Sequence, residues 1–295
     1  MKKKMGLKKA ILMTVSAATS FMLICVTVIG FLVSYFDIKE SLTSETKQEL
    51  LVNAEKMNAW LDAQCVFAAD QGNAAGTLYA LDPDHSGDVD FAKTVMSMNS
   101  ALLEAYTSYE DKSIYMASGA ELPDDFDPTT RGWYQSAKAE DKAICTSPFV
   151  DASTGGIIFT VAAPIKYNGE TVGVFGCDFK LDVLTDLASG MELSENGYPV
   201  LLDGDGNFLV HSNTDYMPTK DGTLTSVDDA EGEYSNMLSS LEDEVSLESY
   251  KDYDGKDKYF VFKKLDNAGW SVGYIMPKSD IDGTLNTLGV IYLIL

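Results

Sequence analysis

The chain has 295 residues, 45% of them hydrophobic, so it is long enough for two modest folded units and too apolar for a disordered protein. Its 45 acidic residues outnumber 22 basic ones, and this negative charge without a basic stripe excludes nucleic-acid binding. The four cysteines and two histidines show no metal-site spacing, and catalytic and nucleotide-binding motifs are absent, so the sequence predicts no enzyme, no metal and no cofactor.

An uncharged segment of 27 residues, Ala10 to Phe36, follows the N-terminus. It exceeds the roughly 20 residues that a helix needs to cross the hydrocarbon core, and the roughly 7–15 apolar residues of a secretory signal. A cleaved signal peptide with its cut near Ala17 and Ala18 is the alternative. Five lysines among residues 1–9 predict a cytoplasmic N-terminus, which places everything after Phe36 outside.

Two amphipathic helices are predicted next. Apolar residues recur at steps of three and four over 50–68 and over 91–105. The first helix is expected to continue from the membrane segment as a stalk over 37–75, with breaks around 71–76 and at 82–84. Its apolar stripe is longer than one small domain needs, which predicts a homodimer along the stalk.

Short runs rich in β-branched and aromatic residues replace the helical pattern after residue 113. Asn168-Gly169 is typical of a type I′ hairpin turn, and Asp254-Gly255 and Asn267-Ala268-Gly269 are expected to be turns as well. A short helix is predicted over 181–188. The predicted strands are 114–117, 144–150, 157–165, 171–179, 198–202, 208–211, 245–250, 259–265 and 270–276. This order predicts two successive α+β units.

Two local features leave alternatives open. The acidic turn 203–207 begins like a calcium loop, but Phe208 stands where that loop requires glycine, so a plain hairpin turn is expected. Cys145 and Cys177 are expected outside the membrane, where a disulfide between them is possible. The chain is large enough to fold by burial without such a bond.

The last segment, residues 285–295, is again uncharged and apolar, and its length is about half of a membrane span. It is predicted to begin a second transmembrane helix. The sequence therefore predicts a protein of the cell membrane, with an extracytoplasmic region over 37–280 held between membrane helices.

The single arginine of the chain, Arg131, stands beside other rare residue types. Its guanidinium offers paired donors that match a carboxylate, and Trp133 and Tyr134 offer flat walls that exclude water. Asp151 and Asp178 follow or close predicted strands and are suitable acceptors for an ammonium group. These residues together predict a site for an amino acid.

The same residues also allow a purely structural interpretation. In that case Arg131 begins a short helix and pairs with a nearby acid such as Asp127, while Trp133 fills the core. The residue types alone leave the two interpretations open.

The arrangement resembles the double Cache family, the extracytoplasmic sensor region of chemoreceptors, sensor kinases and cyclic-dinucleotide enzymes. The resemblance covers roughly 37–280 and rests on the R-x-W-Y stretch at Arg131, an aromatic-x-Asp about 18 residues further on, and Asp178 closing a following strand. It implies an α+β fold with a long N-terminal helix and two tandem PAS-like units. The membrane-distal unit would cover 76–190 and bind the ligand, and the membrane-proximal unit would cover 191–280.

In the amino-acid-binding members of that family, arginine and tryptophan hold the ligand carboxylate, and tyrosine and aspartate hold its amino group. The resemblance therefore assigns Arg131 and Trp133 to the carboxylate. It assigns Tyr134 and Asp178 to the amino group, with Asp151 helping to shape the pocket.

Two positions depart from the family pattern, which expects tyrosine where this chain has Phe126 and Phe149. A buried hydrogen bond to a charged group is worth roughly 1.5–3 kcal/mol, so the missing hydroxyls are expected to weaken binding or to shift the preference. The sequence predicts a chemoreceptor-like sensor of an α-amino acid. The alternatives are the same module sensing an organic acid or other metabolite for a sensor kinase or cyclic-dinucleotide enzyme, and a purely structural ectodomain.

Overall fold

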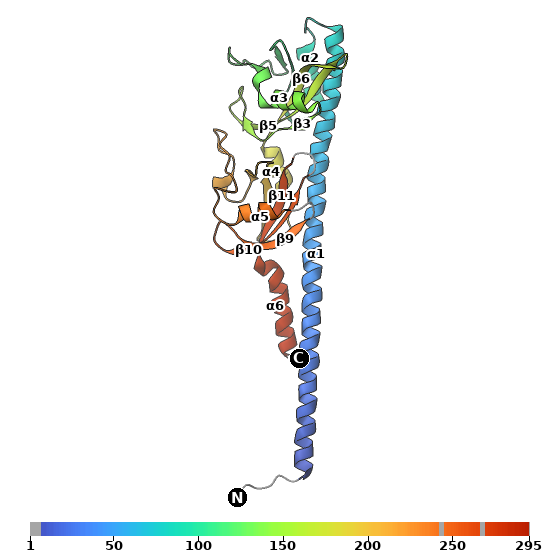
Figure 1. Cartoon of the computed structure of the whole chain (residues 1–295), viewed down its shortest axis with the longest axis vertical. Helices are drawn as coiled ribbons and strands as arrows, with labels where there is room; N and C mark the ends of the chain where they lie inside the picture. Colours follow the sequence, from blue (N-terminus) through green and yellow to red (C-terminus); the bar gives the residue numbers. More distant parts are fainter. Residues whose placement is uncertain (1–6, 242–244, 266–268, 295) are drawn as a thin grey trace.

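The computed structural model describes residues 7–241, 245–265 and 269–294. One helix, α1 (Leu7–Leu81), runs the length of the molecule and carries both sheets along its flank (Figure 1). Within the described part of the chain, α1 is the one helix long and apolar enough to cross a membrane, by length and composition alone. Lysines 2–4 of the predicted cytoplasmic segment lie outside the described residues. The predicted membrane segment and stalk therefore form one continuous rod.

The helix α1 shows no break around Gly72 and Gly76, so the break predicted there is wrong. A Cβ atom on Gly72 would lie 2.8 Å from the carbonyl oxygen of Pro164, and one on Gly76 would lie 2.2 Å from that of Lys166. These glycines lower helix propensity, but they let the helix approach a strand backbone closely. The predicted end of the helix is confirmed, since α1 stops at Leu81, just before the Asp-Pro-Asp sequence.

The second predicted helix is confirmed only in its first part. The helix α2 (Asp88–Met98) ends at Asn99, which is extended and whose side chain accepts a hydrogen bond from the Ala101 amide at 3.0 Å. The residues after it belong to strand β1 (Leu102–Tyr109) and not to the helix. Apolar residues at steps of three and four continue across this boundary by chance, because β1 is buried on both faces.

The first sheet lies far from the apolar half of α1 and is called the distal sheet (Figure 1). Its strand order is β2-β1-β6-β5-β3, with β4 also paired to β5, and all pairs are antiparallel. Positive φ angles of 52° at Asn168 and 84° at Gly169 confirm the predicted tight turn between β5 and β6. The remaining elements here are β2 (Ile114–Met116), η1 (Pro128–Thr130), α3 (Gly132–Glu140), β3 (Ile144–Cys145), β4 (Phe149–Val150), β5 (Ile157–Tyr167) and β6 (Glu170–Lys180).

The second sheet lies between the distal sheet and the apolar half of α1, and is called the proximal sheet. Its order is β8-β7-β11-β10-β9, again antiparallel throughout. Of the predicted turns, Asp254-Gly255 is confirmed, while Asn267 and Ala268 lie outside the described residues. The elements are α4 (Asp182–Ser189), β7 (Tyr198–Leu202), β8 (Phe208–Val210), η2 (Thr214–Tyr216), α5 (Tyr234–Ser240), β9 (Ser246–Lys251), β10 (Asp257–Lys264), β11 (Ser271–Pro277) and α6 (Lys278–Ile294).

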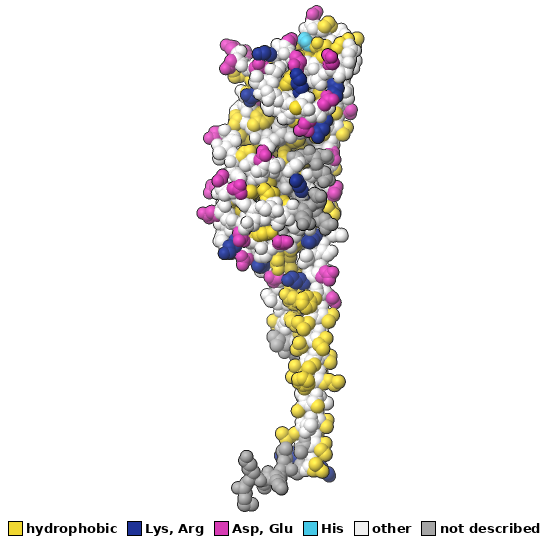
Figure 2. All heavy atoms as spheres, viewed as in Figure 1, with side chains coloured by type: hydrophobic (Ala, Val, Ile, Leu, Met, Phe, Trp, Pro, Cys, Tyr) yellow, Lys and Arg dark blue, Asp and Glu magenta, His cyan; other side chains and the backbone are white. Residues whose placement is uncertain are grey.

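The last helix, α6, returns beside the apolar half of α1 (Figure 1). The hydroxyl groups of Ser34 and Tyr292 lie 3.0 Å apart, and the rings of Phe31 and Tyr292 meet at 5.7 Å. Figure 2 shows charged side chains over the two sheets and apolar side chains along the helices below them. The surface of α1 therefore changes from apolar to charged where the sheets begin.

One hydrophobic core connects both sheets through α1. The ring of Trp60 on α1 lies 5.4 Å from Phe179 and 6.3 Å from Phe159 in the distal sheet. Phe159 in turn contacts Trp270, at the start of β11, at 6.0 Å. The two sheets are therefore packed as one body against the helix, and not as separate units joined by a linker.

The two local alternatives are resolved by the side chains. Asp203 accepts hydrogen bonds from the amides of Asp205 at 3.0 Å and Asn207 at 2.8 Å, as in a closed hairpin turn. Cys145 and Cys177 are both free thiols. Burial raises the pKa of the Cys177 thiol, which keeps it neutral.

Candidate functional site: a cavity under the Arg131 segment

A cavity of about 30 Å³ lies on the face of the distal sheet that α1 does not cover. Such a volume holds about two water molecules, so an amino acid can enter only if the walls move apart. The cavity is lined by Tyr106, Ile114, Met116, Leu122, Phe126, Arg131, Trp133, Phe149, Asp151, Ala152, Ile158 and Asp178. Six of the seven residues predicted from the sequence are on this wall.

The segment before α3 is held by a short capped helix. The Asp127 carboxylate caps η1 by accepting hydrogen bonds from the Thr129 amide at 3.0 Å and its hydroxyl at 2.5 Å. Asp127 also pairs with Lys112 at 2.8 Å, so its partner is not Arg131, as the structural interpretation required. The cap fixes where the chain leaves η1 and therefore where Arg131 begins.

Arg131 lies between η1 and α3 in an extended conformation and is half-buried. Its guanidinium carbon lies 5.3 Å from the centre of the Phe126 ring, a cation–π contact. Among the residues that the structure describes, no carboxylate lies within ion-pair distance of it. The planar fork of donors is therefore available for a carboxylate from outside the chain.

Asp178 on β6 is the buried anion of the site, 5% exposed. One of its oxygens accepts hydrogen bonds from the hydroxyls of Thr160 at 2.6 Å and Tyr106 at 3.1 Å. Burial raises its pKa to about 7, and these two hydrogen bonds oppose the rise without cancelling it. Asp178 is thus a carboxyl group whose charge is disfavoured by burial and would be stabilised by a cation.

Gly176 makes the Asp178–Tyr106 contact possible. Tyr106 on β1 stands opposite Gly176 in the sheet ladder, and a Cβ atom on Gly176 would lie 2.3 Å from the Tyr106 ring. The ring therefore lies flat across the glycine, with its hydroxyl on Asp178 and its edge toward Trp133, 5.1 Å away. Tyr106 and Thr160 were not predicted from the sequence, because cross-strand neighbours are known only once the register is known.

Asp151 follows β4 at the rim of the cavity and is half-buried. Its carboxylate accepts hydrogen bonds within its own turn, from the hydroxyls of Ser153 at 2.7 Å and Thr154 at 2.5 Å and from both amides. Burial disfavours its charge, but the hydrogen bonds outweigh burial and lower its pKa. Asp151 therefore stays ionised and shapes the turn.

Tyr134 is the predicted residue that the structure does not bring to the cavity. Its hydroxyl donates a hydrogen bond to Glu110 at 2.7 Å, and Glu110 is also paired with Lys138 at 2.8 Å. Trp133 and Tyr134 are consecutive helical residues and point to different sides of α3, so only Trp133 lines the cavity. The tyrosine hydroxyl that donates to Asp178 is that of Tyr106, at 3.1 Å.

Comparison with protein families shows one match that covers most of the chain. The family model dCache_1, described as a Cache domain, matches residues 34–285. Among curated proteins, the methyl-accepting chemotaxis protein PctB of Pseudomonas aeruginosa is 25% identical over 255 residues, covering 85% of this chain and 38% of that protein. The methyl-accepting chemotaxis protein McpC of Bacillus subtilis is 25% identical over 275 residues, covering 90% and 39%. The chain thus spans well under half the length of these relatives.

Solved structures agree with the fold. The ligand-binding domain of the Pseudomonas fluorescens chemoreceptor CtaA in complex with L-isoleucine has a TM-score of 0.66 at 22% identity, covering 85% of this chain and 98% of that one. The ligand-binding domain of Pseudomonas aeruginosa PctB in complex with L-Arg has a TM-score of 0.64 at 22% identity, covering 85% and 92%. The double Cache resemblance found in the sequence is therefore confirmed, and the chain belongs to the Cache domain family dCache_1.

Proposed function

We propose that this chain is the extracytoplasmic sensor of a transmembrane chemotaxis receptor and that its distal cavity binds an α-amino acid. One observation carries the proposal: among the residues that the structure describes, Arg131 has no anionic partner and the buried Asp178 has no cationic one, and both line the same small cavity. A zwitterion supplies both missing charges at once. The protein acts by binding, and its ligand is the signal.

The two charged ends of the ligand have separate partners. Arg131 takes the carboxylate in a bidentate pair, and the buried ring of Trp133 shields that pair from water. Asp178 and the Tyr106 hydroxyl take the ammonium group. The predicted role of Tyr134 in holding the ammonium stays a prediction, and Asp151 shapes the rim.

The rest of the lining favours an aliphatic ligand side chain. Once the polar residues are assigned to the two charged groups, the wall that remains is apolar: Ile114, Met116, Leu122, Phe126, Phe149, Ala152 and Ile158. A polar or charged ligand side chain would lose its water there without gaining a partner. We therefore rank small and branched aliphatic amino acids above acidic, basic and amide ones.

The relatives support this assignment by their names. The matched curated proteins are methyl-accepting chemotaxis proteins, and the solved structures are chemoreceptor ligand-binding domains with bound amino acids. In the proposed topology, the apolar part of α1 crosses the membrane and α6 leads back toward it. The stalk of α1 pairs with a second copy, through exposed apolar residues such as Val52 and Val66.

The proposal is tested by calorimetric titration of the full chain, purified in detergent, with each proteinogenic amino acid. Arg131→Ala and Asp178→Ala should each lower the affinity at least about thirtyfold, since removing one partner of a buried charge pair costs roughly 2–5 kcal/mol. Lys138→Ala is the matched control, because Lys138 pairs with Glu110 away from the cavity. If no amino acid binds the parent chain, the assignment is wrong.

A second candidate, an organic acid, is favoured by one observation. Because the pKa of Asp178 is about 7, much of this residue is neutral below that pH and can donate a hydrogen bond to an uncharged group. Such a ligand would need Arg131 but would tolerate Asp178→Asn. An amino acid would not, so this variant separates the two ligand classes.

A further inference from the structure

The proximal sheet repeats the topology of the distal sheet, and the strand registers allow the two to be matched residue by residue. The orders β8-β7-β11-β10-β9 and β2-β1-β6-β5-β3 are the same path. Each central strand has a glycine under an aromatic ring: Gly176 under Tyr106, and Gly273 under Phe262. The two rings come from different neighbouring strands, so the match rests on the hairpins: Val150 pairs with Ile157 where β5 begins, and Lys251 pairs with Asp257 where β10 begins. Counted from these pairs, Ala162 corresponds to Phe262, and Gly176 opposite the first corresponds to Gly273 opposite the second.

The match shows what the proximal unit has in place of the ligand cavity. Two positions further along the ladder, Asp178 corresponds to Ile275, which is fully buried and stands opposite Phe260. Ile158, which lines the distal cavity, corresponds to Lys258. The proximal unit therefore has a lysine at the position where the distal unit has an isoleucine in its cavity wall.

The aspartates of the two rims correspond as well. Asp151 and Asp252 are each the first residue after the edge strand and begin the turn to the next one. The Asp151 amide donates to the Gly156 carbonyl at 2.8 Å, and the Asp252 amide donates to the Lys256 carbonyl at 2.9 Å. The Asp151 carboxylate accepts hydrogen bonds from its own turn, whereas the Asp252 carboxylate points into the proximal unit.

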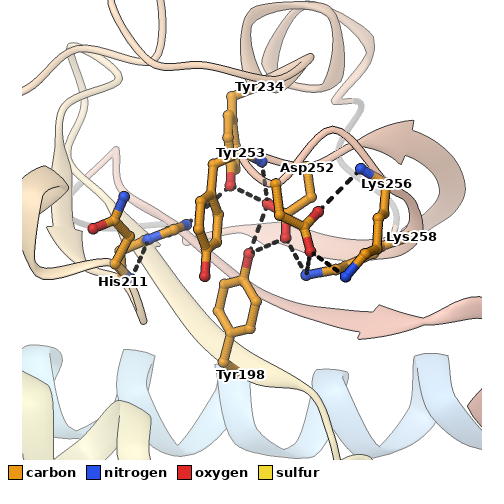
Figure 3. Close-up of polar contacts among 9 residues, drawn as sticks. Tyr198, His211, Tyr234, Asp252, Tyr253, Lys256 and Lys258 are labelled. Carbon is orange, nitrogen blue, oxygen red and sulfur yellow. Dashed lines mark hydrogen bonds and ion pairs between the residues drawn. The ribbon is translucent and has the colours of Figure 1, made fainter.

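Asp252 is the centre of a buried polar cluster, 1% exposed (Figure 3). It accepts hydrogen bonds from the hydroxyls of Tyr198, at 2.7 Å, and Tyr234, and from the ammonium group of Lys258. His211 completes the cluster, with Nε2 3.0 Å from the Tyr234 hydroxyl. Since that hydroxyl donates to Asp252, it accepts from Nε2–H. The Nδ1 atom accepts from the Asn213 amide at 2.9 Å, so His211 is a neutral imidazole.

The Lys258 ammonium is enclosed on several sides. Its side chain is 13% exposed, and the nitrogen lies 5.3 Å from the centre of the Tyr198 ring and 5.5 Å from that of Tyr253. It also lies 3.3 Å from a carboxylate oxygen of Asp254, a second and weaker anionic partner beside Asp252. A carboxylate and two aromatic faces are the groups by which proteins bind alkylammonium ligands. Burial alone would lower the pKa of Lys258, but its bond to Asp252 raises it, so the ammonium stays charged.

We propose that the proximal unit contains an ammonium-binding site whose occupant is the chain's own Lys258. The tethered ammonium neutralises Asp252 and fills the place between Tyr198 and Tyr253, which closes this unit to free amines and amino acids. The inference rests on Lys258 and its contacts alone and does not depend on which ligand the distal cavity takes.

The native chain allows a direct test by reductive methylation of its lysines, followed by mass spectrometry. Lys256, with a side chain 78% exposed, is the matched control two residues away. Only the free amine reacts, so burial and the raised pKa of Lys258 both slow its methylation. Lys258 should react more slowly than Lys256 in the folded chain and equally fast after denaturation. Equal rates in the folded chain would overturn the proposal.

A second test removes the tether. Lys258→Ala deletes the side chain beyond Cβ, and n-propylammonium has the matching length. This ion should raise the melting temperature of Lys258→Ala in the full chain, relative to the same concentration of sodium chloride or 1-propanol. The parent chain and Lys256→Ala should show no such rise. A variant that folds but responds no more than the parent would refute the site, and the methylation test stands if the variant does not fold.

Discussion

Amino-acid binding through Asp178 is expected to depend on pH. Burial raises the pKa of Asp178 to about 7, despite the hydrogen bonds that it accepts. An ammonium group pairs with the ionised carboxylate and not with the neutral acid. Because the apparent Kd is the intrinsic Kd divided by the competent fraction, it should exceed its limiting value about elevenfold at pH 6 and about a hundredfold at pH 5.

The assay is calorimetric titration of the full chain between pH 5 and pH 8 with the amino acid that binds best. Binding at pH 6 should release close to one proton, which repeated titrations in buffers of different ionisation enthalpy will count. Asp178→Asn should bind weakly and with a flat pH profile. A parent Kd that is constant over this range, or a variant that keeps the parent affinity, would refute the assignment of Asp178 to the ammonium group.

The same raised pKa has the opposite effect on the folding stability of the protein without ligand. The folded state holds a proton on Asp178 that the unfolded chain, in which this carboxyl has its ordinary pKa of 3.8, has already released. Stability therefore falls as the pH rises from about 4 to about 7, by roughly 4 kcal/mol for this group. Without ligand, Asp178→Asn should unfold at a higher temperature than the parent at pH 8, and less so at pH 5.

Three further variants test the structure around the two units. Gly176→Ala should lower stability by about 1–3 kcal/mol and weaken ligand binding, because its Cβ atom would meet the Tyr106 ring at 2.3 Å; thermal melts and titration measure both. Asp127→Ala should lower the melting temperature through loss of the η1 cap, whereas Asp124→Ala, at an exposed position, should leave it unchanged. Burial lowers the pKa of His211 to about 4, so the folded chain should lose roughly 3 kcal/mol as the pH falls from 6.5 to 4, and melts of His211→Gln should show a flatter acid limb.

The sequence predicts the strands well because they carry local signals. Asn168-Gly169 allows only a tight turn, and the β-branched runs on either side of it are too short for helices. The sequence wrongly extends a helix into β1 because nearly every residue of this strand is buried. Its apolar positions therefore fit a helical period as well as they fit the alternation of a strand. Gly72 and Gly76 suggest breaks in the sequence because their contacts with β5 lie about 90 residues away along the chain.

The site was predictable where one residue type was rare and not where cross-strand neighbours mattered. Arg131 is the single arginine, and Trp133 follows it closely, so both could be singled out from the sequence. Tyr106 and Thr160 are two of many polar strand residues, and only the registers of β1 and β5 against β6 place them on Asp178. Tyr134 shares its neighbourhood with Trp133, but the helical step turns its hydroxyl toward Glu110.

The contact chain from Trp60 through Phe159 to Trp270 has a consequence for how the protein melts. Because these rings belong to α1, to the distal sheet and to the start of β11, neither sheet can lose its packing without exposing part of the other. Calorimetry of residues 37–280, which include both sheets, should therefore record one cooperative transition and not two. The emission of Trp270, which packs against Phe159, should then change in the same unfolding transition as that of Trp133.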